Sequence, residues 1–325
     1  MSADAAPTAA PFAWSGGKQR LAGRIVDLLP PHRTYVEAFG GAAAVLCAKR
    51  PVVLEVYNDV NAGLVTFFRV LRDRPAELER ALRLTPYSRY EFADCVQTWE
   101  SIEDDLERAR RWYVRCRQVF AGSAATVGWG YEVSGVQRGG TRSGSFATSA
   151  EQLERFAERF RRVQVDHLDW RAVLDRYDGP GACFYLDPPY HPATRGERGL
   201  RRNTAYVHEL SAEDHEDLVA AAVALEGSVL LSGYDHEAYA PLPDAGFERF
   251  SFANNATASR VLSGRGPRLE VLWRRLEPGV HLAQRLWSDD HALSVASHVD
   301  DELIPAHSTV LEDLEEAEHN GVAAS

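Results

Sequence analysis

The stretch FYLDPPYHP, residues 184–192, starts as an apolar strand and ends in a carboxylate, two prolines and a tyrosine. Polar residues at the end of a buried strand are typical of open α/β sheets, which bind ligands beyond the carboxyl ends of their strands. Each proline fixes its φ near about −65° and restricts the preceding residue, so Asp187 stands on a rigid backbone. This stretch predicts a central strand of an α/β sheet with a functional group at its end.

Three other apolar segments also end in polar residues or glycines: TYVEAFGG (34–41), VVLEVYNDVN (52–61) and SVLLSGYD (228–235). Helical patterns follow the first two, and this alternation predicts a parallel sheet. A helix is predicted over 212–225, opening with Ser211 and Asp214 in capping positions. ERFSF and RLEVLWRR predict a late hairpin at the sheet edge.

The region between about 70 and 160 has a different sequence pattern, which predicts a mostly helical insertion. A helix over 102–120 carries apolar residues on one face and arginines on the other, and a glycine- and serine-rich loop is predicted over 134–149. A further helix is predicted from a capping box at Ser149–Gln152. The predicted organisation is an α/β domain in two parts, 1–69 and 161–276, an insertion at 70–160 and an acidic tail at 277–325.

The net charge of −11 argues at first against a nucleic-acid partner, but it is concentrated in the tail. Residues 277–325 hold eleven acids and one arginine, a net of −10, which leaves −1 for the rest. Arginines cluster within that nearly neutral body, and local basic patches rather than total charge attract phosphate. Total charge therefore excludes no function.

Four widely spaced cysteines and no paired-cysteine motif fit a reducing compartment, and we predict no metal site. The N-terminus lacks the features of a secretory signal, and no apolar run is long enough to span a bilayer. We therefore expect a cytoplasmic protein without a membrane partner.

Two segments resemble known nucleotide-binding motifs but lack residues that those motifs require. SGGKQ, which contains Lys18, lacks the early glycine of a phosphate-binding loop, and Gln19 stands where a magnesium-binding hydroxyl is needed. This weakens an NTPase interpretation. EAFGGAAAV is not a dinucleotide fingerprint either. A mononucleotide-like cofactor remains open, because Asp59 at the second strand end can accept hydrogen bonds from a ribose diol.

The Asp-Pro-Pro-Tyr group suits chemistry on a nucleobase amino group, whose lone pair is delocalised into the ring. The carboxylate of Asp187 and the carbonyl of Pro188 can hold its two N–H bonds, and Pro189 keeps them aimed. The ring of Tyr190 offers a face on which an extruded base can stack, worth about 1–3 kcal/mol. An enzyme that modifies a base must take it out of the duplex into such a pocket.

In this order FAWSGGKQR, TYVEAFGGAAAV, VYNDVN and FYLDPPY resemble the Dam-like D12 class (alpha group) of adenine-specific DNA methyltransferases, over about residues 12–275. The resemblance implies a Rossmann-like, mixed seven-stranded sheet, S-adenosylmethionine as methyl donor, double-stranded DNA as partner, and an inserted target recognition domain. A cognate restriction or defence component is a further candidate partner. Ala43 stands where many members have a glycine, and the insertion lacks the asparagine-rich pattern of the GATC-methylating members.

The resemblance also assigns residues. The implied catalytic set is Asp187, Pro188, Pro189 and Tyr190. The implied cofactor-binding set is Trp14, Lys18, Glu37, Phe39, Gly41, Asp59 and Asp187. Our candidates for DNA contacts, chosen from the arginine clusters, are Arg111, Arg115, Arg138, Arg142, Arg201 and Arg202.

We therefore expect transfer of a methyl group to adenine N6 after base flipping. N4-cytosine methylation, RNA adenine methylation and a catalytically silent DNA-binding module stay open as alternatives. The oligomeric state, the recognition sequence and the role of the tail have no signal in the sequence.

Overall fold

The structure of the chain is a computed structural model, and it describes residues 10–14, 16–119, 128–132, 141–194, 208–253 and 269–280. In these ranges no helix has both the length and the apolar character that a membrane span requires. The predicted acidic tail lies outside the described residues from position 281 onward.

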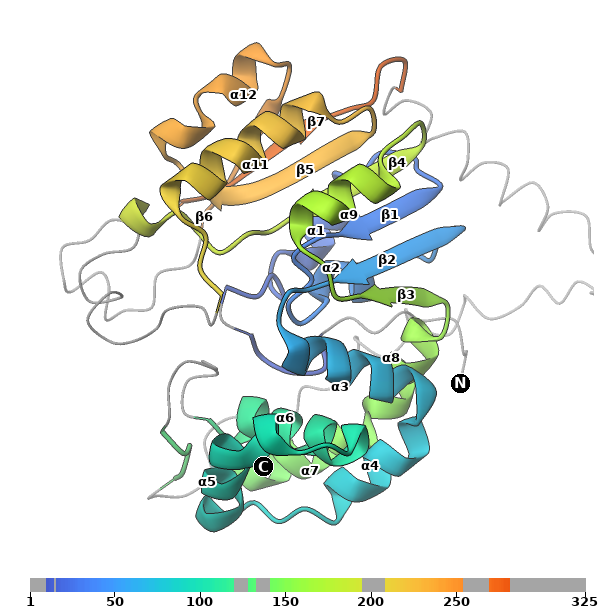
Figure 1. The fold of residues 1–325 in the computed structure, drawn as a ribbon, viewed down its shortest axis with the longest axis vertical. Coiled ribbons are helices and arrows are strands. Elements are labelled where there is room, and N and C mark those ends of the chain that lie inside the picture. The colour runs from blue at the N-terminus through green and yellow to red at the C-terminus, as the bar shows by residue number, and fades with distance from the viewer. Residues whose placement is uncertain are drawn as a thin grey trace, which may run out of the picture. The chain divides into compact units, whose positions relative to one another are not determined.

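A single seven-stranded sheet forms the centre of the fold, in the order β3-β2-β1-β4-β5-β7-β6 (Figure 1). Strands β1 to β5 run parallel to one another, and β7 is antiparallel to both of its neighbours. This confirms the predicted mixed sheet with its late hairpin. The strands are β1 (Thr34–Glu37), β2 (Leu54–Asn58), β3 (Val163–Asp166), β4 (Ala182–Leu186), β5 (Ser228–Tyr234), β6 (Glu248–Ala253) and β7 (Leu269–Arg275).

Helices cover both faces of the sheet, so that all five residues of β4 are buried. Tyr35 and Tyr185 face one side of the core, which is packed by α1 (Ala22–Val26) and α2 (Ala44–Ala48). The opposite side holds Val36 and Phe184. It is packed by α9 (Trp170–Tyr177), α11 (Ala212–Ala224) and α12 (Pro241–Asp244) (Figure 1). The predicted capping box of α11 is present at Ser211 and Asp214.

The segment between β2 and β3 is helical, as expected. Its helices are α3 (Ala62–Asp73), α4 (Pro75–Arg83), α5 (Arg89–Thr98), α6 (Asp105–Gln118), α7 (Arg142–Glu151) and α8 (Leu153–Phe160). The expected boundary at 69/70 falls within α3. Short 3₁₀ turns lie at Trp99–Ser101, Pro192–Thr194 and Glu237–Tyr239.

Two local predictions in this segment are wrong. Part of the expected 134–149 loop is α7, which Thr141 caps by accepting a hydrogen bond from the Gly144 N–H. The side chain of Ser149 makes no capping box, because its hydroxyl donates to the carbonyl of Phe146 and lies 2.9 Å from the Tyr113 hydroxyl. Tertiary packing decides the role of this serine.

A buried ion pair joins the last of these helices to the sheet. The guanidinium of Arg159 on α8 donates to both oxygens of Glu55 on β2, and also to the carbonyl oxygen of Leu46 at 2.7 Å. Lys49 contacts Oε1 of the same carboxylate at 2.5 Å. These charged side chains are almost fully buried, so each depends on the others for compensation.

Candidate active site at the strand ends

Asp187 follows β4 directly, at the carboxyl end of the parallel strands. The ammonium of Lys18 lies 2.6 Å from its Oδ1 and 2.8 Å from its Oδ2. The side chain of Lys18 is 3% exposed and that of Asp187 is 17% exposed. We expected Asp187 to be an open acceptor, but in this structure an internal cation occupies it.

A second carboxylate completes the cluster. Glu270 on β7 lies 3.0 Å from the same Lys18 ammonium, and it accepts a hydrogen bond from the hydroxyl of Tyr190. The Tyr190 ring lies 4.8 Å from the Lys18 nitrogen and packs edge to face with Tyr234 at 4.5 Å. The lysine, the two acids and the tyrosine therefore form one buried group, which we call the ion cluster (Lys18, Asp187, Tyr190 and Glu270).

Burial and the neighbouring charges act on this cluster together. Burial raises the pKa of Asp187 to about 6; Lys18 opposes this shift, and Glu270 adds to it. Burial also disfavours the charge on Lys18, but the charges of Asp187 and Glu270, the nearby Tyr185 and the hydrogen bond to Asp187 together outweigh it, and the lysine pKa lies above its ordinary value. At neutral pH, Asp187 is thus a carboxylate and Lys18 an ammonium.

The loop after β1 is held by the acid that follows β2. Asp59 accepts a hydrogen bond from the Gly41 N–H at 2.9 Å and from the Asn61 N–H at 2.8 Å. Gly41 has a φ of +51°, and a Cβ on it would lie 3.0 Å from the Trp14 indole. The structure thus brings together three of the predicted cofactor-binding residues: Trp14, Gly41 and Asp59. Burial raises the pKa of Asp59, against the effect of these two backbone donors.

Glu37 and Phe39 flank this loop from inside the fold. Oε1 of Glu37 accepts hydrogen bonds from the Tyr35 hydroxyl and the Leu46 N–H, and burial raises the Glu37 pKa to about 8. The half-buried ring of Phe39 packs near Trp170. A cofactor contact remains a prediction for both residues.

The residue at the anticipated glycine position takes a glycine-like conformation. Ala43 has a φ of +57°, and it is the single non-glycine residue with positive φ among the described residues. An alanine therefore reproduces the left-handed turn for which a glycine is favoured.

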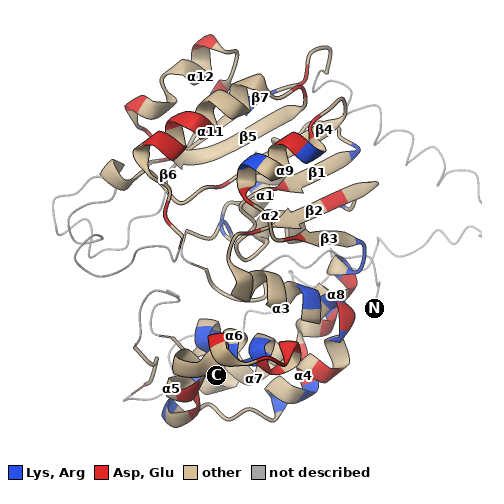
Figure 2. Cartoon of the chain, viewed as in Figure 1, with Lys and Arg blue, Asp and Glu red and all other residues tan. Residues whose placement is uncertain are grey.

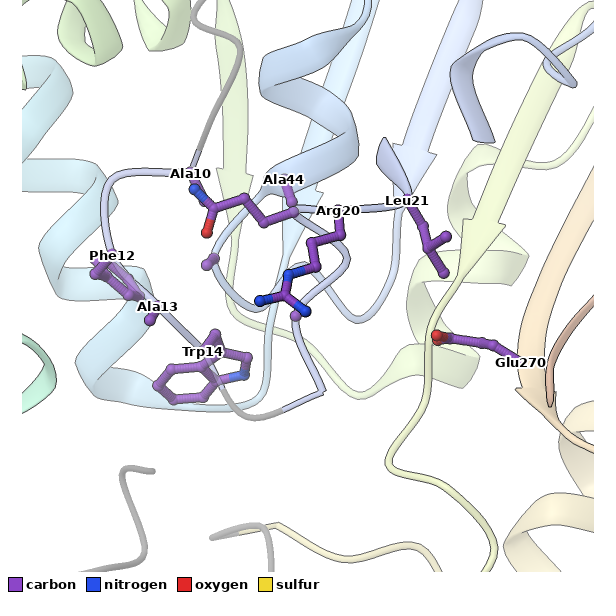
Figure 3. A pocket seen from close by; sticks show the side chains of 11 residues that line it. Ala10, Phe12, Ala13, Trp14, Arg20, Leu21, Ala44 and Glu270 are labelled. Atoms are coloured by element: carbon purple, nitrogen blue, oxygen red, sulfur yellow. The ribbon is translucent and has the colours of Figure 1, made fainter. Parts of the chain in front are cut away.

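A pocket of about 280 Å³ opens beside the ion cluster (Figure 3). Its walls include Trp14, Gly17, Arg20, Ala42 and Glu270. The volume lies just below the range for small-molecule sites, roughly 300–1,000 Å³. Glu270 belongs to both the pocket wall and the ion cluster, whereas Asp187 and Asp59 are not part of the wall.

The arginines predicted to contact DNA have different surroundings. Arg111 is ion-paired with Glu107 and Asp94, and the Arg115 guanidinium lies 5.1 Å from the Trp112 ring. Figure 2 shows acidic and basic residues interleaved over these helices. The half-buried Arg142 starts α7. The other three, Arg138, Arg201 and Arg202, lie outside the described residues. DNA contacts remain predictions for all six.

Sequence reasoning missed Glu270. Its signal was available, since RLEVLWRR places an acid directly before the apolar run VLW, in a strand that has a neighbour on each side. An acid in such a run needs a buried partner, and Lys18 is that partner.

Comparison with known proteins agrees with this arrangement. A family model described as D12 class N6 adenine-specific DNA methyltransferase matches residues 14–223. A DNA N-6-adenine-methyltransferase of Escherichia phage P1 is 27% identical over 216 residues, which are 64% of this chain. The matched part spans 27% of that relative's length. Because the family model covers more than half of the chain, including the ion cluster up to Tyr190, the protein belongs to the D12 class N6 adenine-specific DNA methyltransferase family.

Proposed function

We propose that this protein transfers a methyl group from S-adenosylmethionine to the N6 amino group of adenine in double-stranded DNA. The observation that carries the proposal is Asp187, a carboxylate at the end of the central strand whose two oxygens already hold an internal N–H donor. Membership in the D12 family supports the same reaction.

The charges of the site fit a cationic methyl donor. The ion cluster holds the carboxylates of Asp187 and Glu270 but the single ammonium of Lys18, so its formal charge is −1. A buried negative charge favours a cation in its neighbourhood, and Glu270 lines the adjacent pocket. S-adenosylmethionine, when bound, supplies a methyl group on a positively charged sulfur.

Five of the predicted residues would hold this cofactor: Trp14, Lys18, Phe39, Gly41 and Asp59. Asp59 would accept hydrogen bonds from a ribose, and the position of its carboxylate at the loop after β1 supports this role. Glu37 would not contact the cofactor itself. It would support the site through its hydrogen bonds with the Tyr35 hydroxyl and the Leu46 N–H.

Asp187 would act on the adenine amino group. Its carboxylate accepts an N–H of the amine, and the Pro188 carbonyl accepts the other. Acceptors on both N–H bonds would hold the amine in a geometry that takes the nitrogen lone pair out of conjugation with the ring. The same carboxylate would stabilise the positive charge that develops on N6 as the N–CH₃ bond forms and the S–CH₃ bond of the donor breaks. S-adenosylhomocysteine would be the leaving group, and one N6 proton would be lost through the carboxylate to water. Alignment of the reacting atoms at about 3–3.5 Å supplies the remaining acceleration.

The target adenine must leave the duplex to reach Asp187, because this residue lies at the buried end of a strand. Base flipping is therefore part of the proposal, with Tyr190 beside the extruded base. Contacts to DNA phosphates through the predicted arginines would give an affinity that falls steeply with salt.

Incubation of the purified protein with tritiated S-adenosylmethionine and duplex DNA of mixed sequence tests the reaction. We expect tritium in DNA, and mass spectrometry of the digested nucleosides to identify N6-methyladenine. N4-methylcytosine as the product, or labelling of a matched RNA instead, would contradict the proposal.

Asp187→Ala is the matched inactive variant. We expect it to abolish transfer while the far-ultraviolet circular dichroism spectrum is retained. Glu248→Gln is the control for the loss of a carboxylate, since Glu248 pairs with Arg274 on the same strand pair without contacting the ion cluster. This control should stay active.

A further inference from the structure

In the structure, the Lys18 ammonium stands where the target amine is proposed to bind. It lies within hydrogen-bond distance of both oxygens of Asp187, at the open edge of the carboxylate. An amino group that approaches Asp187 along this edge meets the ammonium. Productive binding of adenine therefore requires Lys18 to move.

Lys18 cannot simply leave. Its side chain is 3% exposed, and a buried ammonium without an anionic partner is strongly unfavourable. Glu270, on β7, already lies 3.0 Å from the same nitrogen. A small rotation of the lysine end would exchange one carboxylate for the other and keep the charge paired.

We propose that Lys18 passes from Asp187 to Glu270 when the target adenine binds, and that Glu270 is the positioning residue that makes this exchange possible. The inference rests on the proposed function, because it assumes that Asp187 receives the amine. Glu270 acts through Lys18 and does not contact the reacting atoms.

Tyr190 contacts both Lys18 and Glu270, and its ring is also the proposed stacking face for the extruded base. Its hydroxyl donates to Glu270, and its ring lies 4.8 Å from the Lys18 nitrogen. Glu270 thus anchors both the mobile ammonium and the ring. Lys18 would stay near the Tyr190 ring whether it pairs with Asp187 or with Glu270, so the ring would keep its position during the exchange.

The sequence offers an unusually clean probe, because Lys18 and Lys49 are its two lysines. Protein labelled with ¹⁵N in the lysine side chains gives two ammonium signals by NMR, and Lys18→Met assigns them. The measured quantity is the rate at which the Lys18 ammonium hydrogens exchange with water, in the free protein and without any ligand.

The variants compared are Asp187→Asn, Glu270→Gln and the double variant. We expect Asp187→Asn to keep a protected Lys18 signal, since Glu270 remains as its anionic partner and the Gly16 carbonyl oxygen accepts from the same nitrogen at 2.9 Å. The double variant should exchange at least about tenfold faster, as an opened site does. Equal loss of protection in Asp187→Asn and in the double variant would overturn the proposal.

A kinetic cycle tests the exchange during turnover. Glu270→Gln should lower kcat with little change in KM for DNA, because Lys18 then stays locked on Asp187. In protein that already carries Lys18→Met, Glu270→Gln should lower kcat no further. The effects of the two substitutions on kcat would then depart from additivity by about threefold or more. Equal loss in both backgrounds would mean that Glu270 has a structural role only. Glu248→Gln serves as control.

The two hypotheses fail in different ways. Absence of methylated adenine with the unaltered protein refutes the proposed function. An active protein whose Asp187→Asn variant loses Lys18 protection, or in which Glu270→Gln acts additively, refutes the exchange alone.

Discussion

The hydroxyl of Tyr57 on β2 donates a 2.7 Å hydrogen bond to the carbonyl oxygen of Gly41, in the loop after β1. The same ring lies against Gly40, where an added Cβ would be 2.2 Å from a ring carbon. The ring is fully buried. A side chain from one strand therefore supports the loop of its neighbour, beside Asp59.

Gly40→Ala should force this ring to shift. We expect a loss of about 1–3 kcal/mol in the free energy of unfolding, as for overpacked cores, together with weaker binding of S-adenosylmethionine. Urea denaturation and calorimetry check both. Gly23→Ala is the control: nothing lies within 4 Å of its added Cβ in α1, and it should stabilise the protein by about 0.5–1 kcal/mol. Two variants of equal stability would contradict the clash.

Asp59→Asn should release the loop at Gly41. An amide nitrogen cannot accept from a backbone N–H, so one of the two hydrogen bonds is lost, at about 1–3 kcal/mol. We expect weaker binding of S-adenosylhomocysteine by calorimetry. Asp169→Asn is the matched control, because that carboxylate caps α9 through the Arg171 N–H. Asparagine keeps the single accepting oxygen and is an equally good cap, so this variant should leave both stability and affinity nearly unchanged.

The acid limb of the activity profile should report Asp187. Its pKa is about 6, raised by burial and by Glu270 and lowered by Lys18; Tyr185 and Glu37 are the further titratable neighbours. Because the carboxylate is the accepting form, kcat/KM should rise as pH passes through about 6. Glu270→Gln removes one raising charge and should move this limb to lower pH. A limb in the same position in both proteins would argue against this assignment.

Glu37 should make stability depend on pH. Its folded-state pKa of about 8 lies above its ordinary value of 4.5, because burial disfavours the charge. The stability that the protonated form contributes is therefore complete below pH 4.5 and is lost as pH rises toward 8. Compared with Glu37→Gln, the native protein should lose on the order of 1 kcal/mol per pH unit in this window. Urea denaturation at pH 5, 6.5 and 8 measures the difference, and a constant difference would disprove it.

Much of the fold could be predicted from local sequence. Strands such as β1, β4 and β5 are apolar runs with polar ends, and the capping pattern at Ser211 marks the start of α11. β3 could not be found, because VQVD is short and partly polar at the edge of the sheet. The cap assigned to Ser149 failed because this residue lies within α7, where its hydroxyl donates to the Phe146 carbonyl and accepts from the Tyr113 hydroxyl, 36 residues away.

The proximity of Lys18 and Asp187 could be predicted from the sequence, but their ion pair could not. The order of the motifs placed Lys18 and Asp187 in one site, but a distance of 169 residues hid their ion pair. The surroundings of Arg111 and Arg115 were equally hidden, since acids on neighbouring helices and tryptophan rings meet them only after folding. Local pattern identifies which side chains gather at a strand end, whereas tertiary contact decides what each one binds.

The ion pair between Arg159 and Glu55 limits how this protein can be re-engineered. Grafting helices α4–α8 from a relative that has no guanidinium at this place would leave Glu55 with the Lys49 ammonium as its remaining charged partner. Replacing Glu55 by a neutral residue would then leave buried Lys49 without its anion. Chimeras that carry the arginine with the transplanted helices should therefore be the most stable, and those that omit it should keep Glu55.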